Sequence, residues 1–308
     1  MKSFAISILL VIACNVATVC AQTAPDAVVV SVKGKAFVKD GKDAEPKPLH
    51  KNDRLFSEQQ VRCEKGCKEL MISYCNVPLP IANGPDWTTI VSINCAAPEV
   101  PRGGGRKSAG TTIIFPREAE TILPRTFALK LAPKQLPAKA RLTLKVNLGE
   151  EIWSEIVNQS MLTSASVHLA QKMVDAQRAG NLRLILILDR DDGKGSETVT
   201  FKLISLTDQK NLDKKLEIFE GVPDVVLRYL GRGLTFCEYR VYDEGVVELE
   251  KAFKIVQSRG AGERTAAGLL RLLILINYQA YNDERVRQLC SSIKNYASLP
   301  LVCSQYSK

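Results

Sequence analysis

The sequence predicts an α+β multidomain chain with a β-rich N-terminal part, a second β part and a helical C-terminal part. Three observations lead to this division. Apolar residues alternate with polar ones in many short stretches before residue 207, and they recur at helical spacing after residue 208. Between the two β parts, residues 100–110 are rich in Gly and Arg and have no periodicity. Alternation indicates half-buried strands, and a spacing of three and four indicates amphipathic helices.

The composition is that of a folded protein. The chain has 308 residues, of which 45% are hydrophobic and 24% charged. This length allows two domains or three small ones, and this composition excludes wholesale disorder, collagen and a multi-span membrane protein. Only two histidines occur, His50 and His168. Their scarcity excludes most histidine-based metal sites and most Ser-His or Cys-His catalytic sets.

Residues 1–21 predict an export signal. Lys2 is followed by the apolar residues 4–13 and then by small residues up to Ala21. The apolar stretch is too short to cross a bilayer core of about 30 Å, and this order of features is typical of a cleaved signal. We expect a periplasmic or secreted product. As an alternative, residues 11–14 resemble the bacterial lipobox, and acylation of Cys14 would give an outer-membrane lipoprotein. Membrane attachment is expected only in that case.

The cysteines fit an oxidising compartment. Seven of the nine cysteines follow Ala21, and the four between residues 63 and 95 have neither the second close pair nor the histidine of a zinc site. Disulfides are the expected state in an exported protein. Spacing does not determine connectivity; the pairs that we predict are Cys63–Cys67, Cys75–Cys95 and Cys290–Cys303, with Cys237 left free.

Residues 27–99 are expected to form a β-rich domain. Val28, Val30 and Val32 alternate with their neighbours, and Gly34, Asp40-Gly41 and Asn83-Gly84 read as turns. The basic Gly-rich segment 100–110 then predicts a linker, with a domain boundary near residue 105. It lacks the Gly-Lys-Ser/Thr ending of a phosphate-binding loop.

Residues 111–207 are expected to form a small β-sandwich of immunoglobulin-like type. Residues 142–148 alternate clearly, and residues 182–188 are almost continuously apolar, which favours a central strand. Turn residues between Asp189 and Gly195 predict a hairpin over 182–205. A helical stretch at about 165–178 interrupts the strands, and Trp153 is expected in the core.

Residues 208–308 are expected to form antiparallel helical hairpins. One apolar stripe covers residues 226–234, a second covers residues 246–256, and two more helices are expected at 269–281 and 284–296. This part resembles tetratricopeptide repeats. The residues at that family's packing positions are Gly233, Phe236, Tyr242, Gly245, Leu249 and Ala252, with a poorer second copy around Leu273, Ile276, Tyr281 and Leu289. An unrelated helical bundle is the alternative.

The resemblance to tetratricopeptide repeats implies a protein-binding surface and two closely packed helices. Gly233 and Gly245 would lie where these helices nearly touch. Replacement of Gly245 by Leu is therefore expected to destabilise the protein. Replacement by Ala is expected to be neutral or mildly stabilising, since the repeat family favours Ala there.

The first domain resembles the FecR-type domain of exported bacterial proteins. The residues that carry the resemblance are Val30-x-Val32-x-Gly34-x-Ala36, Pro48-Leu49, Asn52-Asp53-Arg-Leu55, Val61 and Leu70-x-Ile72. The chain departs from that family at Asn52, often Gly there, and at Asn76-Val-Pro, where an Asp-Gly turn is usual. The resemblance implies an envelope-associated module. A signal-relay function does not carry over, because no cytoplasmic segment is present that could contact a sigma factor.

The chain carries a formal net charge of +9. Basic residues gather at Lys33, Lys35, Lys39, Lys42, Lys47 and Lys51 in the first domain, and at Arg102, Arg106 and Lys107 in the linker. Aromatic residues make up only 6% of the chain, which with export argues against a nucleic-acid partner. An anionic envelope polymer or lipid headgroup is the better partner for this charge. The alternative is that these lysines are solvated and protect strand edges from aggregation.

No catalytic, cofactor or metal site is predicted. Asp189, Asp191, Asp192 and Glu197 fail the spacing of an EF-hand, because Gly193 falls at its fifth position. No Gly-x-Ser-x-Gly occurs. We therefore expect an exported non-enzymatic interaction protein of the bacterial envelope, whose β module docks and whose helices bind a protein. The alternative is a carboxylate-based envelope hydrolase that uses Asp189, Asp191 or Glu150–Glu151.

Overall fold

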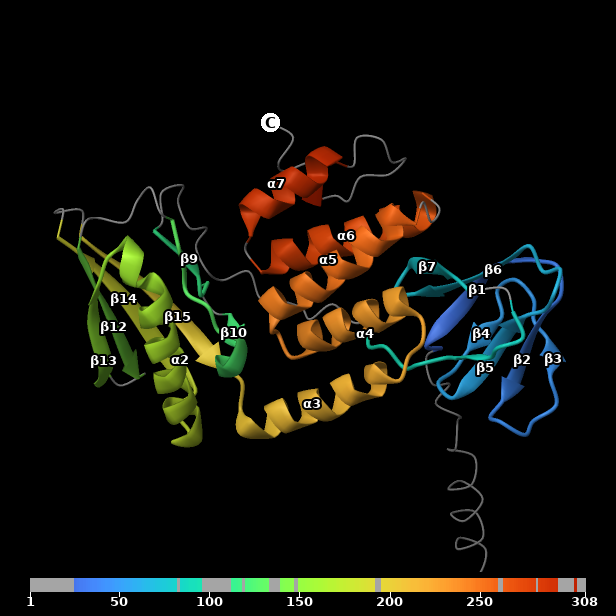
Figure 1. The fold of residues 1–308 in the computed structure, drawn as a ribbon, viewed down its shortest axis with the longest axis horizontal. Helices are drawn as coiled ribbons and strands as arrows, with labels where there is room; N and C mark the ends of the chain where they lie inside the picture. The colour runs from blue at the N-terminus through green and yellow to red at the C-terminus, as the bar shows by residue number, and fades with distance from the viewer. Residues whose placement is uncertain are drawn as a thin grey trace, which may run out of the picture.

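The computed structural model describes residues 25–81, 84–95, 112–117, 120–132, 139–146, 149–191, 195–259, 263–280, 282–292 and 302–303. The predicted signal at 1–21, Cys14, Asn83 and the predicted linker 100–110 lie outside these residues. The protein is α+β: antiparallel sheets come first, a mixed sheet follows, and packed helices complete the chain. In Figure 1 the helices lie between the two β parts.

Two four-stranded antiparallel sheets make up the N-terminal part, in the orders β4-β1-β6-β7 and β3-β2-β5-β8. Their strands are β1 (Ala27–Lys33), β2 (Ala36–Asp40), β3 (Lys47–Pro48), β4 (Arg54–Leu55), β5 (Gln59–Cys63), β6 (Glu69–Tyr74), β7 (Val77–Pro80) and β8 (Thr88–Thr89). Gly34 joins β1 to β2 at a φ of 114°, and a β-carbon on it would lie 2.7 Å from the Cα of Cys67. Only glycine fits this turn.

A five-stranded mixed sheet forms the middle part, in the order β10-β15-β14-β12-β13. Only β10 and β15 pair in parallel. The strands are β10 (Thr121–Ile122), β12 (Ala140–Val146), β13 (Glu151–Val157), β14 (Arg183–Arg190) and β15 (Ser196–Leu203), and a separate ribbon joins β9 (Ile113–Phe115) to β11 (Lys130–Leu131). The 3-10 turns η1 (Pro124–Thr126) and η2 (Gln159–Met161) and helix α2 (Leu162–Arg178) complete this part.

The predicted immunoglobulin-like sandwich is wrong, because the described residues of the middle part form one five-stranded sheet whose core is shared with α2 and the β9–β11 ribbon. The main sheet buries the side chains of Leu144, Leu186 and Phe201, and α2 packs Leu169 and Met173 into the same core. Alternation showed which face of each strand is apolar, but it carries no information about what covers that face. The predicted hairpin over 182–205 is confirmed as β14 and β15, and the predicted helix at 165–178 as α2.

Helices α3 to α7 stack in chain order (Figure 1). They are α3 (Leu206–Glu220), α4 (Val225–Glu238), α5 (Tyr242–Ser258), α6 (Glu263–Gln279) and α7 (Asp283–Ser292). Ser205 and Asp224 cap α3 and α4 by accepting hydrogen bonds from the amides of Asp208 and Leu227. The sequence did not predict α3 as a separate helix, and α6 begins six residues before the expected start at residue 269. In the described chain, no helix is both long and apolar enough to cross a bilayer.

One hydrophobic core joins the N-terminal sheets to α4–α7, although the middle part separates them in sequence. Val77 and Leu79 of β7 share this core with Leu269 and Leu273 of α6. Gly268 lets α6 approach closely, since a β-carbon on it would lie 3.1 Å from the Cα of Val77. A smaller apolar cluster connects the helices with the middle part; it contains Leu123, Ile204, Leu212, Leu216, Phe236 and Val241.

Candidate functional site

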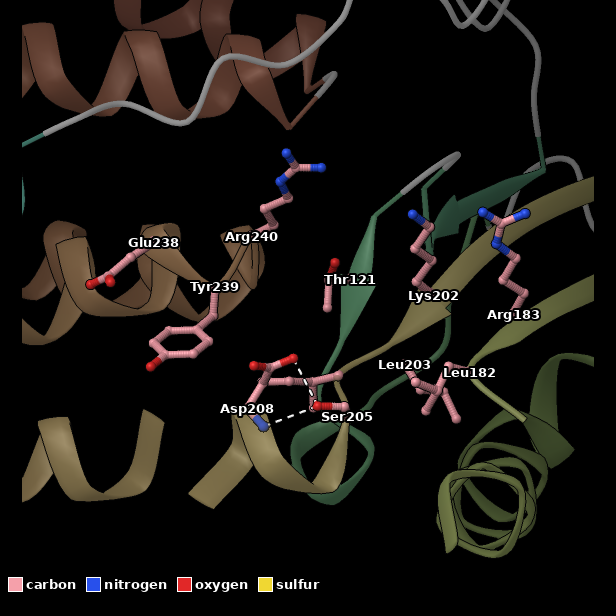
Figure 2. Close-up of a pocket in the computed structure, with 11 residues that line it drawn as sticks. Thr121, Leu182, Arg183, Lys202, Leu203, Ser205, Asp208, Glu238, Tyr239 and Arg240 are labelled. Carbon is pink, nitrogen blue, oxygen red and sulfur yellow. Dashed lines mark hydrogen bonds between the residues drawn. The ribbon is translucent and has the colours of Figure 1, made fainter. Parts of the chain in front are cut away.

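A cavity of about 600 Å³ lies where the edge of the mixed sheet meets α3 and the end of α4 (Figure 2). Sheet strands, the start of α3 and the residues after α4 each supply part of its lining. The lining residues are Thr121, Leu182, Arg183, Lys202, Leu203, Ile204, Ser205, Asp208, Glu238, Tyr239 and Arg240. This volume lies within the range of small-molecule sites.

Two cations enter the cavity from neighbouring strands. Arg183 of β14 and Lys202 of β15 are direct partners in the antiparallel ladder. Their β-carbons therefore lie about 5 Å apart on one face of the sheet. Thr121 of β10 pairs with Lys202 on its other side. The ladder therefore sets a hydroxyl, an ammonium and a guanidinium side by side, and Figure 2 shows all three pointing the same way.

A third cation reaches the cavity from the helices. Arg240 follows α4 with a φ of 62°, in the left-handed region that glycine usually occupies at this position. Its amide donates to the carbonyl of Cys237 at 2.9 Å, and the amide of Val241 donates to the carbonyl of Phe236 at 3.0 Å. This closure of α4 holds Arg240 at the rim, with its guanidinium on the side of Lys202 and Arg183 (Figure 2).

Both carboxylates of the cavity already have partners. The side chain of Asp208 accepts a hydrogen bond from the hydroxyl of Ser205 at 2.7 Å, within the cap of α3. Glu238 accepts from the ammonium of Lys215 at 2.5 Å. By contrast, Arg183, Lys202 and Arg240 form no ion pair with any carboxylate of the described ranges. The lining can therefore hold an anion.

A buried acidic cluster lies directly behind Thr121. Glu120 is buried, its side chain accepts from the amide of Arg117 at 3.3 Å, and the two side chains come within 3.5 Å. Burial raises the pKa of Glu120 to about 7; Asp243 and Glu244 add to this, and Arg117 opposes it. Burial also raises the pKa of Glu244.

This cluster ties the middle part to the start of α5. The ammonium of Lys130 lies 2.8 Å from Asp243, and the guanidinium of Arg117 lies 3.6 Å from it. The hydroxyl of Thr126 donates to Glu244. These contacts hold β10 and η1 against the helices, and so they fix one wall of the cavity.

The carboxylates of the hydrolase hypothesis do not meet. Strand β12 pairs Arg141 with Asp189 on one side and Lys145 with Glu151 on the other. Asp189 and Glu151 are thus about 13 Å apart along the strand direction. Glycosidase pairs lie within about 10 Å. Asp189 accepts a hydrogen bond from the hydroxyl of Ser196.

None of Glu150, Glu151, Asp189 and Asp191 lines the cavity. The side chain of Glu197 accepts from the amide of Thr112 at 2.7 Å, which anchors the chain ahead of β9. Asp192 and Gly193 lie outside the described residues. No cluster of three or more potential metal ligands occurs within the described part of the chain.

The two histidines have local carboxylate partners. The imidazole Nδ1 of His168 lies 3.0 Å from Glu155, a contact between α2 and β13. The backbone amide of His50 donates to Asp53 at 2.7 Å. Neither histidine lines the cavity.

The structure contains the three predicted disulfides, Cys63–Cys67, Cys75–Cys95 and Cys290–Cys303. Such bonds are typical of an oxidising compartment. Cys237 is free and buried, and burial raises the pKa of its thiol to about 12.

The residues of the proposed repeat positions lie mainly inside the helical stack. Tyr242, Leu249 and Ala252 are buried in the large core. Phe236 instead faces the smaller cluster toward the middle part. Gly233 and Gly245 lie at a close approach of α4 and α5.

Several lysines of the first domain are engaged with neighbours. Lys33 lies 2.7 Å from Glu69 and Lys47 lies 3.5 Å from Asp40. The ammonium of Lys39 stands 4.7 Å from the centre of the Trp87 ring, as does the guanidinium carbon of Arg62. These contacts lower the charge that the domain offers to an anionic polymer.

Sequence reasoning did not single out Arg183, Lys202 or Arg240. A signal existed for two of them, because Arg183 and Lys202 stand at matching places on the two arms of the predicted hairpin. No sequence pattern connects Arg240 with that hairpin. Arg240 reaches the cavity only because α4 packs against the sheet.

Comparisons with protein-family models, with curated proteins and with solved structures give no match to this chain.

Proposed function

We propose that this chain is an exported, non-enzymatic interaction protein of the bacterial cell envelope. In this proposal the N-terminal β module, which resembles a FecR-type domain, docks on an envelope component. The tetratricopeptide-like helices bind a protein partner. The product is periplasmic or secreted, with an outer-membrane lipoprotein acylated at Cys14 as the alternative. The three disulfides support an oxidising location.

The shared core of the N-terminal sheets and helices α4–α7 is the observation that carries this proposal. Thr265 of α6 donates its hydroxyl to the carbonyl of Pro78 at 2.6 Å, and Gly268 packs on Val77. Interfaces between domains are usually polar and allow relative motion, whereas this one is a continuous hydrophobic core. A partner bound to the helices would thus be held in a fixed position relative to the β module, as a scaffold requires.

The helices offer apolar side chains to a partner. Ile218 on α3, Val247 on α5 and Leu275 on α6 are 60%, 47% and 40% exposed. Each lies on a different helix of the stack, so a partner that spans several helices could cover them together. Val167 on α2 is 64% exposed and belongs to the middle part, which makes it a matched control.

The test is a pull-down from the envelope fraction with the purified mature protein. We expect the triple variant Ile218→Glu, Val247→Glu and Leu275→Glu to lose the captured protein, and Val167→Glu to retain it. All these positions are exposed, so thermal melts should show that every variant is folded. Equal capture by the wild type and the triple variant would refute a helical binding surface.

The spacing of Asp189 and Glu151 gives the hydrolase alternative no support, and no other observation favours it. Acid–base chemistry by two carboxylates requires that both reach one bond of the substrate. The two carboxylates that line the cavity, Asp208 and Glu238, are held by Ser205 and Lys215.

A further inference from the structure

The arrangement of Arg183 and Lys202 is unfavourable in the absence of a ligand. Like charges placed directly opposite each other on a sheet repel and destabilise it. Here the neighbour on the other side of Lys202 is the neutral Thr121, so the ladder itself offers no compensating charge.

Arg240 increases this charge from a separate element. It comes from the end of α4, and its guanidinium lies on the same side of the cavity as the other two cations (Figure 2). Glu238, the neighbouring carboxylate, points away from Arg240 (Figure 2), and it accepts a hydrogen bond from the ammonium of Lys215. Asp208 is engaged with Ser205. Three cations from two parts of the fold thus line one cavity and point to the same side of it (Figure 2), and none of them has a protein counter-ion among the described residues.

The rest of the lining suits an organic group. Leu182 and Tyr239 are partly exposed and supply apolar surface at the sides, whereas Leu203 and Ile204 are each 3% exposed and belong to the two cores behind the lining. A cavity of about 600 Å³ is larger than a lone phosphate ion requires. The hydroxyl of Thr121 can donate a hydrogen bond to the same ligand, whereas the hydroxyl of Ser205 already donates to Asp208.

We propose that this cavity binds a phosphate ester, with the phosphate held by Arg183, Lys202 and Arg240 and the organic part against Leu182 and Tyr239. Arginine donates paired hydrogen bonds to phosphate oxygens, and lysine supplies a point charge. Three cations match the two charges of a phosphomonoester better than the single charge of a carboxylate. The site is independent of the helical partner surface proposed above.

Calorimetric titration of the mature protein tests the site with three probes of similar size: glucose 6-phosphate, glucuronate and glucose. We expect saturable binding of the phosphate ester, at least about tenfold weaker binding of glucuronate, and none of glucose. A fourth titration, with a glycerol-phosphate oligomer, distinguishes a polymer-borne phosphodiester from a small phosphomonoester. Tighter binding of the oligomer assigns the site to the polymer, and tighter binding of glucose 6-phosphate assigns it to the small ester.

Three single variants locate the site: Arg183→Gln, Lys202→Gln and Arg240→Gln. Each variant is expected to weaken the binding of glucose 6-phosphate about tenfold or more, since each removes one charged hydrogen-bond donor. Lys65→Gln is the control, because Lys65 is an exposed cation of the N-terminal part. Binding that all three variants leave unchanged would overturn the site, as would the absence of saturable binding to both phosphate probes. Equal binding of glucuronate and glucose 6-phosphate would overturn the choice of phosphate.

A second measurement does not depend on the choice of probe. Replacement of Lys202 by Thr removes the repulsion with Arg183, so the ligand-free variant is expected to melt at a higher temperature than the wild type. A lower melting temperature would show that Lys202 has a stabilising structural partner, contrary to the proposal.

Discussion

Gly233 of α4 and Gly245 of α5 meet backbone to backbone. A β-carbon on Gly245 would lie 2.9 Å from the carbonyl oxygen of Gly233 and 2.6 Å from the sulfur of Cys237. A β-carbon on Gly233 would lie 3.0 Å from the carbonyl oxygen of Gly245 and 2.6 Å from Cγ of Leu249. The two helices therefore leave no room for a methyl group on either residue.

Replacement of Gly245 by Ala should destabilise the protein, contrary to the expectation from the repeat resemblance. Ala gains about 1 kcal/mol of helix propensity over Gly. Overpacking against a backbone carbonyl typically costs about 1–3 kcal/mol, so the net effect should be a loss. Gly221→Ala is the control, since a β-carbon there meets nothing within 4 Å. Urea unfolding gives the midpoint of each variant. Equal midpoints for Gly245→Ala and Gly221→Ala would refute the close approach of the two helices.

Replacement of Gly268 by Leu should weaken the joint between α6 and the N-terminal sheets. Its β-carbon would meet the Cα of Val77 and, at 3.3 Å, the carbonyl oxygen of Asn76, which belong to a paired strand and its turn. We expect a loss of about 1–3 kcal/mol in the free energy of unfolding. Gly268→Ala should cost less than Leu, and this order is the internal control. A Leu variant as stable as the wild type would show that α6 and β7 do not pack closely in solution.

The buried Glu120 should make stability depend on pH. Its folded pKa of about 7 lies above the ordinary value of 4.5, because burial disfavours the charged form. The folded state then binds more protons than the unfolded state between these two values, and stability falls as pH rises from about 4.5 to 7. One pKa unit corresponds to about 1.4 kcal/mol, so this contribution is on the order of 3 kcal/mol.

Glu120→Gln should remove this part of the pH dependence. Urea unfolding at several pH values between 4 and 8 gives the slope for both proteins. We expect the variant to gain stability relative to the wild type as pH rises, with no further gain above about pH 7. Arg117, Lys130, Asp243 and Glu244 stay in both proteins, so their titration cancels to first order. Parallel pH profiles would show that Glu120 has an ordinary pKa.

Thiol labelling should find no reactive cysteine in the native mature protein and one in denaturant. Three disulfides hold six cysteines, and Cys237 is buried with a pKa raised to about 12. The thiolate is the reactive form, so labelling of the native state should be very slow. The measurement is mass spectrometry after alkylation without reductant. Several labelled thiols in denaturant would contradict the disulfides and the oxidising compartment.

Local sequence determined the elements and their apolar faces. Spacing alone predicted several elements, because each depends on residues near one another in the chain. These are the apolar stripes on α4 and α5, the hairpin of β14 and β15, and helix α2. Spacing did not determine the disulfide connectivity, although each of the three bonds closes a short segment; the longest joins Cys75 to Cys95, a separation of 20 residues.

Only the tertiary structure decided what each apolar face meets. The sheet that buries Leu144 and Leu186 shares its core with α2 and the two-stranded β9–β11 ribbon, and β7 packs on α6 from the far end of the chain. The charged cavity arose in the same way, since Arg240 joins Arg183 and Lys202 only where α4 meets the sheet edge. Such contacts depend on the complementary shape of two distant surfaces, and neither segment carries that information in its own periodicity.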